Sequence, residues 1–120
     1  MNLLKPIPEL RRGFKDKKHK DRVGNLPCLC CIKDKEPQKS PVEVHHLWGI
    51  GAGQKASDRL CFGICNLHHT GSYGGAEKGL TLHTNLAAFE KNYGTQHQLI
   101  KETYEMLGLE ELYESYNITT

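Results

Sequence analysis

The chain has 120 residues, with five cysteines, seven histidines and a formal net charge of +2. Its length suits one domain with tails, and a hydrophobic fraction of only 38% predicts a thin core that a bound metal would help to stabilise. No apolar run is long enough to span a membrane, and no secretory signal follows the first charges. We therefore expect a cytoplasmic protein whose cysteines are thiols or metal ligands and not disulfides.

The first segment, residues 1–27, is strongly basic. It carries eight Lys and Arg against three acidic residues, a balance of +5, whereas residues 28–85 sum to +1 and residues 86–120 to −4. Its prolines and glycines predict an extended arm. Such an arm suits a nucleic-acid backbone, and the alternative is a solvated, partly disordered tail. The lysines that we expect to contact nucleic acid are Lys15, Lys17 and Lys18.

The remainder, residues 28–120, is predicted to form an α+β domain. Two β-rich runs, VEVHHL at 42–47 and RLCFGI at 59–64, predict a hairpin with a long, glycine-containing connection. The stretch CNLHH predicts the first turn of a short helix, broken by a glycine cluster. Two helices are then predicted after the N-caps Asn85 and Thr95, with Leu and Tyr side chains along their core faces, and one more short helix at the C-terminal end.

Two pairs of thiol and imidazole ligands predict a metal site. Cys28 and Cys31 form a C-x-x-C pair, and Cys65 and His68 form a C-x-x-H pair. Two thiolates on a tight turn, closed by a matching pair at a helix start, are typical of a tetrahedral structural zinc site with no open position. Cys30 leaves a second choice within the first pair. The alternative to zinc is a set of buried thiols.

Three nearby histidines, His45, His46 and His69, are then left over. Neighbouring side chains of a strand point to opposite faces, so His45 and His46 cannot both hold one ion unless the strand ends or twists there. They could instead divide the work, one binding a metal ion and the other acting on water as general base. The ordinary pKa of histidine suits that role. The alternative is a pair of surface histidines.

Taken together, CLCC at 28–31, EVHH at 43–46 and CNLHH at 65–69 resemble the motif of the HNH endonucleases, also called ββα-metal or His-Me finger enzymes. The stretches HHLWGIGAGQKASD, CNLHH and FEKNYGT are similar, more narrowly, to the phage-derived Ref family of recombination-enhancement nucleases, which cut DNA with help from a RecA filament. The resemblance covers about residues 28–99. It implies a small zinc-stapled ββα-metal core with C-terminal helices, and a phage- or prophage-derived, metal-dependent DNA endonuclease whose partners are DNA and a RecA-type filament.

The resemblance also implies roles for single residues. It implies structural Zn²⁺ at the two ligand pairs described above. The residues implied to hold a catalytic Mg²⁺ or Mn²⁺ ion are His45, His69 and, as a third ligand or a phosphate contact, His83. The implied general base is His46. The Asn that orients this base in HNH enzymes has no counterpart, because Leu60 stands at its position. Either Asp58 or a backbone carbonyl would then orient His46.

Lys55 and Arg59, near the hairpin, are further candidates for phosphate contact, with a solvated surface as the alternative. Three classes of function remain open. We predict a metal-dependent DNA endonuclease, because both histidine pairs need an explanation. A zinc-stabilised nucleic-acid-binding module without cleavage is the main alternative, and the missing Asn favours it. The third class is a zinc-held adaptor whose acidic C-terminal helices contact another protein.

Overall fold

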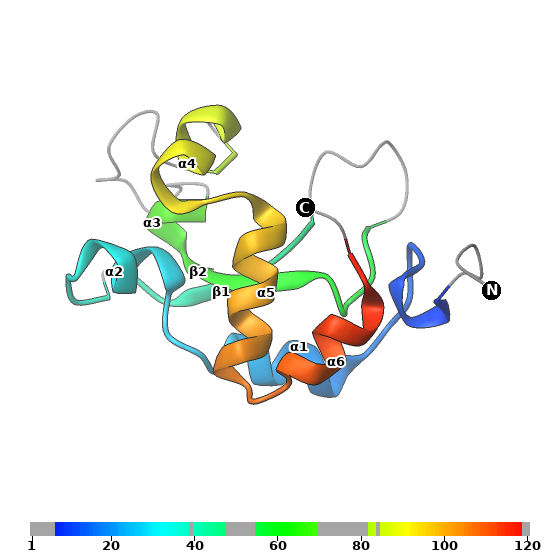
Figure 1. Ribbon diagram of the computed structural model, residues 1–120. Helices are drawn as coiled ribbons and strands as arrows, with labels where there is room; N and C mark the ends of the chain where they lie inside the picture. The colour runs from blue at the N-terminus through cyan, green and yellow to red at the C-terminus, as the bar shows by residue number, and fades with distance from the viewer. Residues whose placement is uncertain (1–6, 39, 48–54, 70–81, 84, 119–120) are drawn as a thin grey trace.

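The computed structural model describes residues 7–38, 40–47, 55–69, 82–83 and 85–118. The first elements are a short 3-10 helix, η1 (Pro8–Leu10), and the helices α1 (Lys17–Gly24) and α2 (Leu29–Asp34). Next come the strands β1 (Val42–His46) and β2 (Cys61–Cys65), and the helices α3 (Asn66–His69), α4 (Leu86–Tyr93), α5 (Gln96–Met106) and α6 (Glu110–Tyr116). The predicted α+β class is confirmed (Figure 1).

The two strands form the predicted antiparallel hairpin. Val42 lies opposite Cys65, and His46 lies opposite Cys61. Every residue of β2 is buried, which explains its nearly unbroken apolar sequence. The second strand begins at Cys61, two residues later than the sequence pattern predicts. The glycine-containing connection at 48–54 and the glycine cluster at 71–75 lie outside the described residues.

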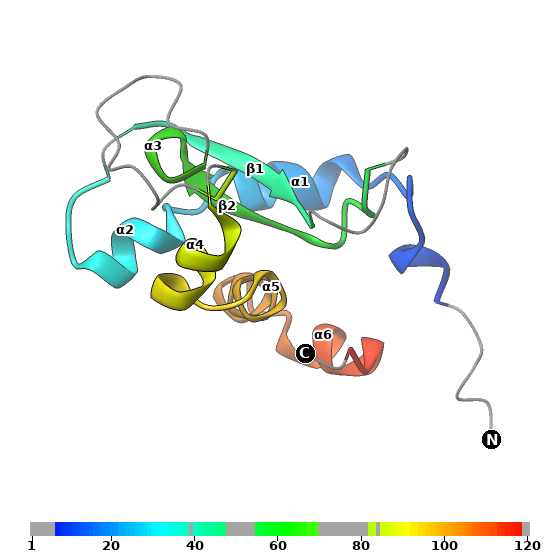
Figure 2. The same cartoon turned by 90° about the horizontal axis from the view of Figure 1, so that it is seen from above.

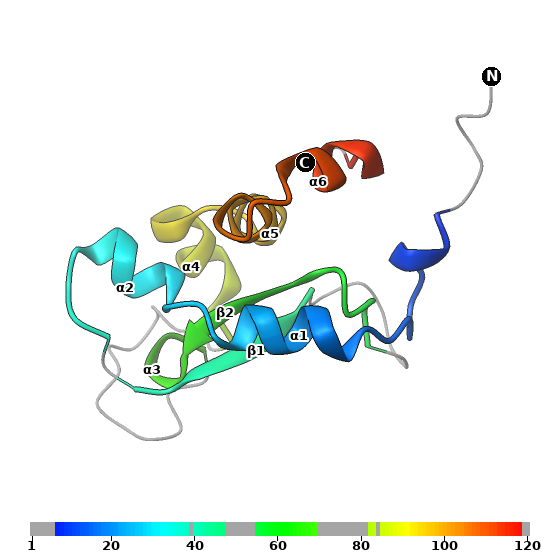
Figure 3. The ribbon, with the colours of Figure 1, turned by 90° about the horizontal axis from the view of Figure 1, so that it is seen from below.

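Helices cover both faces of the hairpin. Figures 2 and 3 show α1 on one face and α4 and α5 on the other. The contact with α1 is close at Gly63, where a Cβ atom would lie 2.9 Å from Cγ1 of Val42 and 3.1 Å from the backbone oxygen of Val23. A glycine is needed there because any larger residue would push α1 away from β2.

The main core lies between β2 and the C-terminal helices. Its fully buried side chains include Phe62, Ile64, Phe89, Leu99, Ile100 and Tyr104. The predicted core face of α5 is therefore confirmed. Both predicted N-caps are confirmed as well, because the side chain of Asn85 accepts the N–H of Ala88, and Thr95 forms a capping box with Gln98.

The expectation of an extended basic arm is wrong for Lys17–Gly24, which forms α1 and packs on the hairpin. Asp16 caps this helix by accepting the backbone N–H of His19, and Lys17 pairs with Asp21 at 2.8 Å. These local contacts support a helix despite the scattered charges. Helix α2 was also not predicted. None of the described helices is long and apolar enough to cross a bilayer.

Candidate functional site

The four side chains of the predicted zinc site lie together. The ligand atoms of the buried residues Cys28, Cys31, Cys65 and His68 are all within 4.8 Å of one another. The Sγ atoms of Cys31 and Cys65 are 3.7 Å apart, and Nδ1 of His68 lies 3.2 Å from Sγ of Cys65. A tetrahedral zinc ion with bonds of about 2.0 to 2.3 Å requires ligand separations of about 3.3 to 3.8 Å. The donor set therefore fits a closed zinc site.

Two element ends position these ligands. Cys28 is the N-cap of α2, and its Sγ accepts the N–H of Cys31 at 3.4 Å. Cys65 ends β2, directly before α3. Cys30, the second choice in the first pair, is buried outside the group. Its hydrogen bond to Cys28 and its burial both raise the pKa of the Cys30 thiol, so that Cys30 stays protonated. The geometry thus favours Cys28 and Cys31 as the ligands.

A carboxylate behind His68 sets the orientation of its ring. Nε2 of His68 donates to Oδ2 of Asp34 at 3.2 Å, and the hydroxyl of Tyr93 donates to the same oxygen at 3.0 Å. With the proton on Nε2, the lone pair of Nδ1 points toward the three thiols. This arrangement of carboxylate, imidazole and ligand group is the one that structural zinc sites use to orient a histidine.

A second cluster is formed by His45 of β1, His69 of α3 and His83. Their ligand atoms also lie within 4.8 Å of one another, and the cluster runs from a buried to an exposed member. Nε2 of His69 is 3.0 Å from Nδ1 of His45 and 3.0 Å from Nε2 of His83. The backbone N–H of His83 donates to the oxygen of His69 at 3.1 Å, which holds the two residues side by side. Because His83 is exposed, we call this group the open cluster, in contrast to the closed cluster of buried ligands.

The other nitrogens of two of these rings already have acceptors. Nδ1 of His69 donates to Oε1 of Glu43 at 2.9 Å, and Nε2 of His45 donates to Oε1 of Gln96 at 3.1 Å. Burial lowers the pKa of His45 to about 3, so this ring is neutral. The remaining nitrogens of His45 and His69 then face each other with lone pairs, which repel unless a cation lies between them. The cluster therefore fits a metal ion.

His46 points to the other face of β1 and does not join this cluster. Its Nε2 lies 2.8 Å from Oδ1 of Asp58. The backbone N–H of Asp16 donates to Oδ2 of Asp58 at 2.7 Å. Burial alone would raise the pKa of Asp58, but the hydrogen bonds from Asp16 and His46 outweigh it and lower that pKa. An ionised Asp58 keeps the proton of His46 on Nε2 and leaves Nδ1 with the lone pair.

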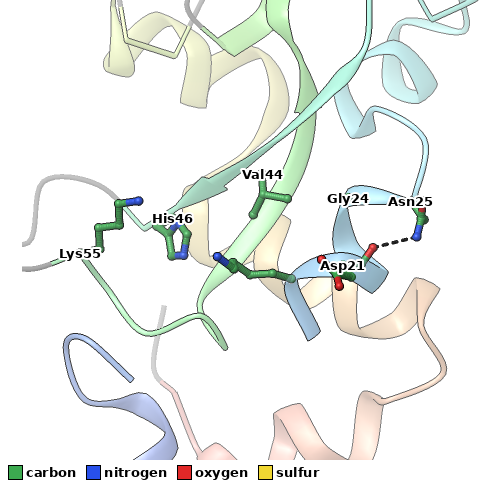
Figure 4. Close-up of a pocket in the computed structure, with 7 residues that line it drawn as sticks. Asp21, Gly24, Asn25, Val44, His46 and Lys55 are labelled. Atoms are coloured by element: carbon green, nitrogen blue, oxygen red, sulfur yellow. Dashed lines mark hydrogen bonds between the residues drawn. The ribbon is translucent and has the colours of Figure 1, made fainter. Parts of the chain in front are cut away.

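His46 also lines an open pocket of about 620 Å³ between α1 and the hairpin. Figure 4 shows Lys55 beside His46, and Asp21 of α1 and Asn25, the C-cap of that helix, across the pocket. Lys20 of α1 lines it too. Sequence reasoning did not select Lys20, because it treated this segment as an extended arm. The signal that could have revealed a helix here is Asp16, a typical N-cap residue, with Lys20 and Gly24 at helical spacing after it.

The other lysines predicted to contact nucleic acid lie outside this pocket. Lys15 and Lys18 are exposed, and Lys17 is exposed but paired with Asp21. Arg59 is engaged within the fold. Its Nε donates to Asp16 at 2.6 Å, and its Nη1 donates to the hydroxyl of Tyr116 at 2.6 Å. Of the five predicted contacts, the structure brings only Lys55 next to His46. The five residues that the sequence predicts to contact nucleic acid are Lys15, Lys17, Lys18, Lys55 and Arg59.

Two comparisons with known proteins give matches for this chain. An uncharacterised Escherichia coli (strain K12) protein, YdfU, is 36% identical over an alignment of 97 residues that covers 78% of this chain. The chain spans only 23% of the length of that relative. The family described as "Recombination enhancement, RecA-dependent nuclease" matches residues 14–108, from the approach to α1 to the end of α5. The chain therefore belongs to the family of recombination-enhancement, RecA-dependent nucleases.

Proposed function

We propose that this chain is a metal-dependent DNA endonuclease of the HNH, or ββα-metal, type. The observation that carries the proposal is the division of the His45-His46 pair. His45 enters the open histidine cluster, and His46 turns to the other face of β1, where Asp58 holds it. A hydrolase needs a site for a charge-neutralising ion and a base for water, and the two neighbouring residues at the end of β1 would supply one function each.

His46 is the general base in this proposal. Its Nδ1 accepts a proton from water while the ionised Asp58 stabilises the imidazolium that forms. The water oxygen bonds to phosphorus, the bond from phosphorus to the 3′ oxygen breaks, and the 3′ oxygen takes a proton from solvent. The products are a 5′ phosphate and a 3′ hydroxyl. Asp58 thereby takes the place of the Asn that HNH sequences carry, and weakens the case for a binding module without cleavage.

The residues that would hold the catalytic ion are His45, His69 and His83. When bound, the ion would neutralise negative charge on the scissile phosphate and on the leaving oxygen. Mg²⁺ prefers oxygen ligands, whereas three imidazoles suit transition metals. Between the two ions expected from sequence, Mn²⁺ therefore fits better than Mg²⁺. The residues that would hold a structural Zn²⁺ are Cys28, Cys31, Cys65 and His68.

The proposed substrate is DNA and the proposed partner is a RecA-type filament. The family description supports both, and the exposed lysines of the N-terminal segment support contact with a phosphate backbone. A phage or prophage source and a cytoplasmic location, both expected from sequence, are compatible with such a substrate. Lys15, Lys17 and Lys18 would contribute long-range attraction, because they lie on or next to the exposed side of α1.

A nicking experiment tests the proposal. Supercoiled plasmid is incubated with Mn²⁺ or Mg²⁺, with and without a RecA filament, and with wild type, His46→Ala or His97→Ala. We expect the His46 variant to cut roughly 10²- to 10⁴-fold more slowly. His97→Ala is the matched control, because His97 belongs to neither histidine cluster. Inactivity of wild type in every condition, with retained DNA binding, would instead support the non-cleaving module.

A further inference from the structure

We propose, on the basis of the proposed nuclease function, that the pocket beside His46 binds a DNA backbone phosphate next to the one that is cut. Lys20 and Lys55 are the residues that would hold this phosphate. The pocket lies between α1 and the hairpin, on the face of β1 opposite the open histidine cluster. Lys20 thereby becomes a substrate-binding residue in the segment that sequence reasoning treated as an arm.

The charges of the pocket favour a phosphate. Lys20 and Lys55 line it from α1 and from the segment before β2. Within the described residues, neither amine has an ion-pair partner, whereas Lys17 is paired with Asp21. Asp21 lines the pocket but is paired with Lys17, and the Lys20 ammonium lies near enough to the carboxylate of Asp58 to help lower its pKa. Two such cations beside a proposed base attract an anionic backbone.

The size of the pocket also suits a segment of DNA backbone. The pocket has a volume of about 620 Å³ and is open to solvent at one side. A group of the size of a nucleotide fits into such a volume. Polar side chains dominate the lining, with Val44 as the apolar member. A charged, flexible strand can enter such a pocket without losing contact with water. An apolar small molecule would find little surface there.

The geometry of displacement places the phosphate that is cut beside His46. The attacking water and the leaving 3′ oxygen lie roughly in line on opposite sides of phosphorus, and the 5′ oxygen lies in the equatorial plane between them. Because His46 holds the water, the phosphate that is cut lies against His46, and a neighbouring phosphate of the same strand would reach Lys20 and Lys55.

The first test measures binding without cleavage. A short fluorescent DNA duplex is titrated with zinc-containing protein in buffer without added Mg²⁺ or Mn²⁺, at several salt concentrations, and anisotropy is recorded. Lys20→Gln and Lys55→Gln should each weaken binding and reduce the slope of log Kd against log salt by about 1. Lys101→Gln, an exposed lysine of α5 outside the pocket, is the control. Unchanged slopes in both pocket variants would overturn the phosphate site.

The second test measures the contact with a neighbouring phosphate. A duplex with one uncharged methylphosphonate is cut, with a RecA filament where needed, and the two bonds flanking the neutral position are compared. Wild type should cut one of these two bonds more slowly than the other, because only one of them then lacks the charge that Lys20 and Lys55 bind, and Lys20→Gln should lose this difference. Equal rates in wild type overturn the contact with a neighbouring phosphate. If wild type cuts nothing, the nuclease proposal falls, whereas the binding test still decides whether the pocket holds phosphate.

Discussion

Asp16 and Asp58 are joined by a hydrogen bond of 2.7 Å, from the backbone N–H of Asp16 to Oδ2 of Asp58, although 42 positions separate them in the chain. Asp16 is also the N-cap of α1, and its carboxylate accepts Nε of Arg59 at 2.6 Å. The start of α1 therefore fixes the carboxylate that holds His46. We infer that Arg59 is a positioning residue that acts on His46 through Asp16 and Asp58.

The first prediction concerns this chain of contacts. Asp58→Ala should lower kcat for DNA cleavage by about 10- to 100-fold, because His46 loses the acceptor that fixes its tautomer and orientation. Arg59→Lys should have a smaller effect of the same kind, since Lys cannot contact Asp16 and Tyr116 together. KM and zinc content should stay unchanged in both. A parallel loss of zinc or of DNA binding would show that these residues support the fold only.

The second prediction concerns the closed cluster. Protein purified without chelator should contain one tightly held zinc per chain, measured by elemental analysis. Cys65→Ser should lose this zinc and lower the melting temperature, because metal binding is coupled to folding of the hairpin and α2. Cys30→Ala is the matched control, and it should keep the zinc. Loss of zinc in Cys30→Ala alone would assign the ligand to Cys30 instead of Cys28 or Cys31.

The third prediction concerns the open cluster. Glu43→Gln should weaken Mn²⁺ binding by about 10- to 100-fold, because a carboxylate acceptor keeps the proton of His69 on Nδ1 and leaves Nε2 for the ion. Titration calorimetry or the electron paramagnetic resonance of free Mn²⁺ would measure the change. His97→Ala should bind Mn²⁺ as wild type does. Equal binding by Glu43→Gln would indicate that Mn²⁺ binds elsewhere.

The fourth prediction concerns acid stability. His19 is buried against Tyr104, and within the described residues its Nε2 has no hydrogen-bond partner. Burial lowers the pKa of His19 below 6.5. The unfolded chain therefore binds the proton first, so this contribution to the free energy of unfolding is fully present above about pH 6.5 and is lost as pH falls through the folded pKa.

His19→Phe, which keeps a ring against Tyr104, should reduce this loss. The slope attributable to His19 is at most about 1.4 kcal/mol per pH unit. Urea unfolding of both proteins between neutral pH and pH 5 would measure it. Parallel pH dependence of the two proteins would mean that His19 is not the group that titrates.

The sequence predicted the hairpin, the C-terminal helices and the closed cluster because local patterns determine them, whereas the members of the open cluster were implied by the resemblance to HNH enzymes. Alternating and near-continuous apolar residues mark β1 and β2, and Asn85 and Thr95 mark helix starts. The spacing of a C-x-x-C and a C-x-x-H pair restricts the geometry of the closed cluster. Such signals extend over a few residues, so they can be read without tertiary structure.

The relationships that sequence reasoning missed are tertiary. Helix α1 is stable partly because His19 and Val23 are buried against distant residues, a contribution that is not visible in the segment alone. Arg59 looked like a phosphate contact, but Asp16 and Tyr116 engage it across 43 and 57 positions. The proximity of Lys20 to His46 has the same origin, since α1 brings it there. The tertiary fold therefore decides which basic side chains are engaged within the protein and which are not.

Helix α3 is four residues long and carries His68 in the closed cluster and His69, its next neighbour, in the open one. One turn of backbone therefore serves both proposed metal sites. A chelator should then act on two timescales. Removal of the exchangeable ion would be fast and reversed by adding Mn²⁺, whereas slow extraction of zinc would release α3 and carry His69 out of position, so that Mn²⁺ alone could no longer restore activity.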